Sequence, residues 1–220
     1  MTQDCEVMRF EVGFFLKSRF SSVHPDMLYQ PSFVKYDGDD DYDLVLAEVC
    51  AEHIDELICY YESLFSCIDK YSERYHKQHL WLRPGLFCGD EMLFGFPWYD
   101  RLIDITRLFD ELKEKEEGTL FSTGDQGWYF EIFQLNDKLL FYETAQEDEM
   151  DFSVDDFDER LFSQDKKYHF DFDDFGFVEY TWAWEDKDAL LQQMEKKILI
   201  TRDVIDKLTA HFKSDYWSSY

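Results

Sequence analysis

The chain has few basic residues for its length. It holds 22 Lys and Arg against 49 Asp and Glu in 220 residues, so its formal net charge is −27. This charge repels nucleic-acid phosphates and anionic lipids, and direct binding to nucleic acid or to a membrane surface is therefore not expected. With only 9 Gly and 4 Pro, the sequence also lacks the composition of a low-complexity chain. Its 45% hydrophobic residues supply a folded core.

Motifs that carry known chemistry are also missing. The sequence contains no GxSxG, GxxxxGK[ST], GxGxxG or HExxH pattern, which excludes the familiar nucleophile elbow, phosphate loop, dinucleotide site and zinc hydrolase site. Carboxylates are so numerous that any two of them could be named as an acid and a base, and their presence is uninformative. We expect no catalytic residue, cofactor or metal, and predict that the protein is not an enzyme. An enzyme of unrecognised type is the least favoured alternative.

No targeting segment is predicted. Arg9 and Glu11 interrupt the first apolar stretch, and no run approaches the roughly 20 apolar residues that cross a bilayer. The cysteines are odd in number and contain no CxxC pair: Cys5, Cys50, Cys59, Cys67 and Cys88. Reduced thiols in a cytoplasmic protein are the simplest interpretation, and we expect a cytoplasmic location.

The acidic residues are concentrated in two blocks. Residues 37–60 hold nine acids and no Lys or Arg, and residues 143–188 hold seventeen acids and four bases. Together these blocks carry −22 of the −27 charges. A uniformly acidic surface would serve solubility, whereas concentrated blocks indicate a directed electrostatic field.

Hydrophobic spacing predicts three helices. Apolar residues recur every three or four positions over residues 43–76, which predicts one long amphipathic helix with Asp39, Asp40 and Asp41 at its N-terminus. A loop with Pro84, Gly85, Gly89, Gly95 and Pro97 is expected next. A second helix is predicted over residues 98–116, ended by Gly118, and a last one over residues 186–213.

Alternating patterns predict antiparallel strands. Residues 128–133 and 138–142 flank Asn136 and Asp137, which is typical of a β-hairpin. Residues 8–16 and 176–184 predict two more strands. The expected fold class is α+β, with long amphipathic helices packed around a small antiparallel β-sheet. We expect a single domain over residues 1–220, with a sub-division near residue 118 as the alternative (helical part 37–118, sheet and C-terminal helix 119–220).

Two patterns were tested as metal sites. Acids fall at positions 1, 3, 5, 7 and 12 of the loop 37–48, as in a calcium loop, but Tyr42 stands where the sharp turn requires Gly. An acidic loop entering a helix is the favoured interpretation. His76 and His79 are one helical turn apart but have no third ligand, so a polar helix end is favoured there.

The tract from Glu147 to Glu185 interleaves carboxylates with aromatic rings. One interpretation is a solvated acidic face whose rings point into the core. The other is an interface in which aromatic residues anchor a basic partner and carboxylates steer it. On the second interpretation we predict partner-facing acids and two aromatic anchors, Asp155, Asp156, Asp158, Asp171, Asp173, Asp174, Phe157 and Phe172, with Asp39, Asp40 and Asp41 as a second set.

A tight turn precedes the predicted hairpin. Thr123-Gly124-Asp125-Gln126-Gly127-Trp128 places two glycines around an Asp-Gln pair. The simple interpretation is the entry to an aromatic strand. The functional interpretation adds Asp125 and Trp128 to the partner-facing residues.

Residues 98–142 combine this turn with a preceding amphipathic helix and a following hairpin. This module resembles bacterial immunity proteins of polymorphic and type VI secreted toxins. The resemblance implies a small acidic cytosolic protein that binds and neutralises a cognate toxin, and it implies no catalytic residue. Such a toxin would act on nucleic acid or nucleotides and would need a positive cleft.

An alternative function fits the same charge. A DNA mimic encoded by a phage or plasmid would inhibit restriction, CRISPR or other DNA-binding proteins by presenting carboxylates in place of phosphates. A mimic needs rows of carboxylates at phosphate-like spacing, whereas a dedicated inhibitor needs one aromatic-centred patch. The clustering into two blocks with interleaved Phe favours the dedicated inhibitor.

Overall fold

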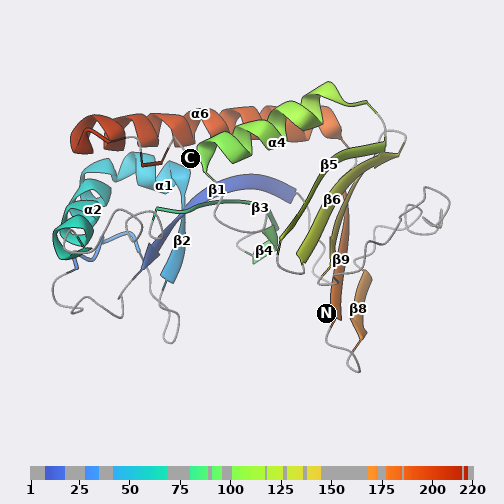
Figure 1. Cartoon of the computed structure of the whole chain (residues 1–220), viewed down its shortest axis with the longest axis horizontal. Coiled ribbons are helices and arrows are strands. Elements are labelled where there is room, and N and C mark those ends of the chain that lie inside the picture. The colour runs from blue at the N-terminus through green and yellow to red at the C-terminus, as the bar shows by residue number, and fades with distance from the viewer. Residues whose placement is uncertain are drawn as a thin grey trace. The chain divides into compact units, whose positions relative to one another are not determined.

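The protein contains helices and two antiparallel sheets (Figure 1). The structure is a computed structural model. Tertiary contacts divide the chain into two compact units: unit 1 comprises Met1–Thr106 and Gln193–Tyr220, and unit 2 comprises Arg107–Gln192. The prediction of a single domain, with its alternative sub-division, stays a prediction. The described residues are 8–17, 28–34, 42–68, 80–88, 91–95, 101–116, 118–125, 128–135, 138–144, 168–172, 177–184, 186–214 and 216–217.

Unit 1 is built on a four-stranded sheet. Its strands are β1 (Met8–Lys17), β2 (Tyr42–Leu46), β3 (Leu82–Cys88) and β4 (Glu91–Gly95), in the order β2-β1-β3-β4 with every pair antiparallel. The predicted strand at residues 8–16 is confirmed as β1. Because side chains alternate along a strand, every second residue of β1 belongs to one face. That row is fully buried: Phe10, Val12, Phe14 and Leu16.

The predicted helix over residues 43–76 is wrong at its start. Residues 43–46 belong to β2, which is followed by α1 (Ala47–Glu52) and α2 (Ile54–Ile68), and residues 69–79 lie outside the described residues. The apolar run Leu44-Val45-Leu46 fits either period, and pairing with β1 selects the strand. α1 begins at Ala47 with Leu46 as its N-cap, so Asp39 to Asp41 are not at the N-terminus of this helix as predicted.

Much of the predicted loop after residue 80 belongs to two paired strands instead, and its Gly89 and Pro97 lie outside the described residues. Pro84 and Gly85 lie within β3, and Gly95 ends β4. Pairing between β3 and β4 reaches only to Gly85, opposite Gly95. Pro84 therefore lies just beyond that pairing, where a residue without an N–H is tolerated. These residues are turn formers on average, and the pairing with β1 overrides that preference.

An aromatic cluster joins α2 to the end of the chain. The ring of Tyr61 lies 5.2 Å from that of Trp217, and Phe65 lies 5.1 Å from Phe212, at the end of α6 (Lys187–Phe212). Trp217 is fully buried. Lys213 adopts a left-handed backbone with φ of 53°, which ends the helix and reverses the chain. The predicted C-terminal helix is thus confirmed.

Unit 2 contains a five-stranded antiparallel sheet. The order is β5-β6-β7-β9-β8, with bounds β5 (Gly118–Asp125), β6 (Trp128–Leu135), β7 (Lys138–Thr144), β8 (Tyr168–Phe172) and β9 (Phe177–Trp184). The predicted hairpin is confirmed as β6 and β7, and the strand at 176–184 as β9. β5 and β8 were not predicted.

The second predicted helix is confirmed as α4 (Leu102–Glu114). Its buried stripe follows the predicted spacing: Leu102, Ile105, Leu108 and Leu112. Gly118 does not end the helix directly, because it starts β5 with φ of 77°. The predicted combination of helices with antiparallel sheet is therefore confirmed, with two sheets where one was expected.

We expect Trp217→Ala to lower the free energy of unfolding by about 3–5 kcal/mol, because it empties a fully buried site in the aromatic cluster. Urea unfolding followed by circular dichroism measures the change. Leu199→Ala on α6 is the control, since that side chain is 56% exposed and should cost less than about 0.5 kcal/mol. Equal losses in the two variants would show that Trp217 does not anchor the cluster.

Candidate functional site

Four of the predicted partner-facing residues lie within described strands. Asp125 ends β5, Trp128 begins β6, and Asp171 and Phe172 end β8. The remaining predicted residues lie outside the described residues: Asp39, Asp40, Asp41, Asp155, Asp156, Phe157, Asp158, Asp173 and Asp174.

Strand register brings these four residues to one end of the five-stranded sheet. Asp125 lies opposite Trp128 in the β5–β6 pair, and β6 begins at Trp128 as predicted. At the other edge, Asp171 lies opposite Val178 and Phe172 opposite Phe177, where β9 begins. Between these two edges, Tyr129 pairs with Thr144 and Glu143 pairs with Tyr180. Both pairs lie at the same end of the sheet as the four predicted residues.

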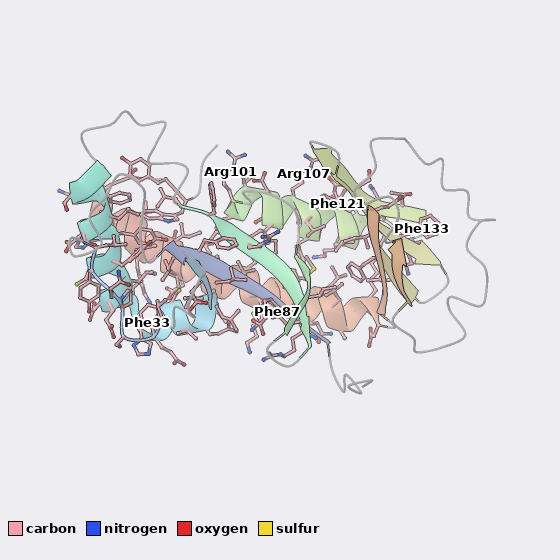
Figure 2. The ribbon with its side chains drawn as sticks, turned by 90° about the horizontal axis from the view of Figure 1, so that it is seen from below. Phe33, Phe87, Arg101, Arg107, Phe121 and Phe133 are labelled. Carbon is pink, nitrogen blue, oxygen red and sulfur yellow. The ribbon has the colours of Figure 1, made fainter. Side chains whose placement is uncertain are left out.

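Because paired residues lie on the same face of a sheet, the pairing also shows to which face each position belongs. The positions of Asp125, Trp128 and Asp171 belong to one face, and the position of Phe172 belongs to the other. Asp125 and Asp171 are four strand spacings apart, or about 19 Å. Phe121 and Phe133, labelled in Figure 2, likewise occupy positions on opposite faces. Asp171 and Phe172 are therefore on opposite faces although they are neighbours in sequence, whereas Trp128 shares the face of the two acids.

The face that holds the positions of Asp125, Trp128 and Asp171 also includes Gln134, which contacts a helix. Lys187 of α6 donates a hydrogen bond of 3.3 Å to Gln134 Oε1, and a shorter one to the Lys115 carbonyl after α4. Ile132, Leu139 and Phe141 of this face are fully buried. The two predicted acids thus lie at the end of a face whose middle is part of the unit 2 core.

Two acids of the block of residues 37–60, Glu48 and Glu56, are bonded inside unit 1. Lys197 of α6 lies between Glu11 of β1 and Glu48 of α1, and its ammonium group donates to both carboxylates. Glu11 is buried in the sheet, and Arg9 lies 3.8 Å from it. The four charges sum to zero, so the two cations offset the cost of burying the Glu11 carboxylate in this acidic chain. The sequence patterns did not predict this cluster. A glutamate, Glu11, within an otherwise apolar strand was the only feature of the sequence that could have indicated it.

Another side chain of α6 near this cluster accepts a hydrogen bond from the backbone of β1. β2 pairs with β1 from Gly13 to Lys17, and Phe10 lies before this stretch. Gln193 of α6 accepts the Phe10 N–H at 3.0 Å. At Gly13 itself a Cβ would lie 2.6 Å from the side chain of Leu44, so a larger residue there would displace that side chain.

Glu56 of α2 holds a separate segment against the helix. Its carboxylate accepts the Ser32 N–H at 2.6 Å and the Ser32 hydroxyl at 2.9 Å. The hydrogen bonds from Ser32 lower the pKa of Glu56, and His53 at 3.3 Å adds to the effect. Phe33, labelled in Figure 2, lies 5.0 Å from the His53 ring.

The described residues offer little nucleophilic or metal-binding chemistry. Cys50 and Cys59 are free thiols, and burial raises the pKa of Cys50 well above its usual range, which keeps it protonated. Within the described ranges, no three His, Cys, Asp or Glu side chains are grouped to hold a metal ion. Glu48, the last position of the candidate calcium loop, is bonded to Lys197 instead. No described helix combines the length and hydropathy of a membrane span.

The two units differ in charge. Unit 2 holds 25 acids and 8 bases in 86 residues, so it carries −17, whereas unit 1 carries −10 in 134 residues. The described acids of the first block are partly bonded within unit 1, as Glu48 and Glu56 show. The field available to a partner is therefore strongest around unit 2.

Comparison with known proteins identifies no relative: no family model, no curated protein and no solved structure matches this chain.

We expect Lys197→Met to lower the free energy of unfolding by about 3 kcal/mol, because it leaves two carboxylates facing each other at a buried junction. Lys207→Met is the matched control on the same helix: its pair with Asp203 is exposed and should contribute about 0.5 kcal/mol or less. Adding Glu11→Gln and Glu48→Gln to Lys197→Met should restore part of the loss. If Lys197→Met and Lys207→Met unfold at the same urea concentration, the cluster does not stabilise the fold.

The Ser32 contacts predict an acid-sensitive attachment. Because the pKa of Glu56 is lower in the folded state, its carboxylate stabilises the fold above the unfolded pKa, and this contribution is lost as pH falls through the folded pKa. Ser32→Ala should raise the pKa of Glu56, as measured by NMR titration. Glu56→Gln should lose less stability than wild type on acidification below about pH 5. A Glu56 pKa unchanged by Ser32→Ala would contradict the assignment.

Proposed function

We propose that this chain is an immunity protein: an acidic cytoplasmic protein that binds a basic bacterial toxin and occludes its active site. The observation that carries the proposal is the concentration of acidic residues in one unit, with −17 of the −27 charges in unit 2. A cleft that binds nucleic acid or nucleotides is positively charged, and such a field attracts it. The protein acts here as a binding protein and needs no catalytic residue.

The arrangement of unit 2 supports this proposal. Two edge strands end at the same end of the sheet with the predicted residues Asp125 and Asp171. Acids at this end steer a basic partner, and aromatic residues beside them supply buried contacts after docking.

A DNA mimic is the second candidate, and salt dependence separates the two. The full chain would be used as bait in an extract of its source organism, eluted with a salt gradient and read by mass spectrometry. One stoichiometric basic partner supports an immunity protein, and co-expression with that partner should then protect growth. A series of unrelated DNA-binding proteins supports the mimic. An empty elution contradicts both.

Charge reversal tests the residues assigned to the partner. Replacing Asp155, Asp156 and Asp158 by Lys should slow association with the basic partner by about tenfold or more at low salt, with little change in stability. The matched control replaces Glu52, Glu195 and Asp206 of unit 1, which are exposed, and should slow association much less. Surface plasmon resonance measures the rates. Unchanged binding after the first triple reversal would overturn the assignment.

A further inference from the structure

We propose that the outer edge of β8 is the docking site for an extended basic strand of the partner, which adds to the sheet of unit 2. This inference rests on the proposed function and specifies how the partner binds. In strand addition, main-chain hydrogen bonds supply affinity, and side chains at alternate positions supply specificity.

β8 is one of the two edge strands of the five-stranded sheet. The strand order ends at β8, and within the ranges that the structure describes no strand pairs with its outer edge. The outer edge of a terminal strand presents backbone N–H and C=O groups at alternate residues. An added strand would offer these groups hydrogen-bond partners in regular register.

The opposite edge strand, β5, is less suited to this role. The β5–β6 register shifts between Thr119 and Phe121, so β5 is irregular there. The ammonium group of Lys115 also donates a hydrogen bond of 2.7 Å to the Leu120 carbonyl within that irregular stretch. An irregular strand with an engaged carbonyl and a nearby cation does not favour addition of a basic strand.

The sequence of β8 defines what the added strand should look like. Tyr168, Phe170 and Phe172 occupy positions on one face of the sheet, while His169 and Asp171 occupy positions on the other. A strand beside β8 places its own alternate residues next to these two rows. The complementary strand therefore alternates apolar residues with Lys or Arg.

Charge selects a basic partner over a second copy of this chain. The block of residues 143–188, which contains β8 and β9, holds seventeen acids and four bases. Two copies that each carry −27 repel each other, whereas a basic strand is attracted. Asp171 on the edge strand thus discourages self-association and favours the expected occupant.

A synthetic peptide of alternating lysine and valine, about seven residues long, is the probe. We expect it to bind the full chain, and we expect the same peptide with every backbone nitrogen methylated to bind at least about tenfold more weakly, because methylation removes the strand's donors and keeps its charge. Isothermal titration calorimetry measures both. No binding of the unmethylated peptide, or equal affinity of the two peptides, would overturn the proposal.

Hydrogen exchange locates the binding site. Adding the unmethylated peptide to the full chain should slow amide exchange in β8, while the exchange of β5 and of the unit 1 sheet stays unchanged. Asp171→Asn should weaken binding about threefold at low salt, and the matched Asp206→Asn on α6 by less than about 1.5-fold. Protection of another edge strand, or concentration-dependent pairing of the protein with itself through β8, would overturn the assignment.

The outcome is separable from that of the proposed function. If one basic partner is retained in the extract but exchange in β8 is unchanged in that complex, the immunity function stands and strand addition is wrong. If β8 captures the peptide but no basic partner is retained, strand addition stands and the proposed function is wrong.

Discussion

The contact between Lys197 and two carboxylates supports much of unit 1. It joins the central strand, through Glu11, to α1, through Glu48, and to the long α6. A cation at this junction offsets the buried Glu11 and the half-buried Glu48, which would repel each other without it. Arg9 completes a set of four charges that sums to zero. Lys197 therefore links the sheet, α1 and α6, and Gln193, four residues earlier on the same helix, accepts a hydrogen bond from the backbone of β1.

This junction also explains why the two acidic blocks have different consequences. In the first block, Glu48 is neutralised by Lys197 and Glu56 is bonded to Ser32, so these charges contribute more to cohesion than to the outer field. In unit 2 the bases are too few to do the same, with 8 against 25 acids. The unit must tolerate its own repulsion, which lowers its stability unless a basic partner relieves it. That unrelieved repulsion is the physical basis for expecting a partner.

Patterns within one segment predicted α4, α6 and the β6–β7 hairpin because each satisfies its own period locally. The secondary-structure predictions failed where the local residues were compatible with more than one kind of element. Leu44 to Leu46 suit a helix or a strand, and only the pairing with β1 selects the strand. Pro84 and Gly85 usually form turns, but here they belong to a strand that pairs with the same central strand, β1. The contact of Glu11 with Lys197 joins residues 186 positions apart, and no local pattern indicates it. The segment 123–128 indicated the strand that begins at Trp128, but not its pairing with Asp125 of β5.

Separation limits what the predicted acids can do together. Asp125 and Asp171 stand on opposite edge strands, about 19 Å apart, whereas charges are screened over about 8 Å at physiological salt. A single basic side chain therefore interacts with only one of them. Strand alternation imposes a second limit, since it assigns Asp171 and Phe172 to opposite faces although they are adjacent in sequence. A partner that uses both acids must distribute its cations across the sheet, and a partner that uses Asp171 with Phe172 must reach both faces of β8. An extended strand beside β8 meets the second requirement because its own side chains alternate in the same way.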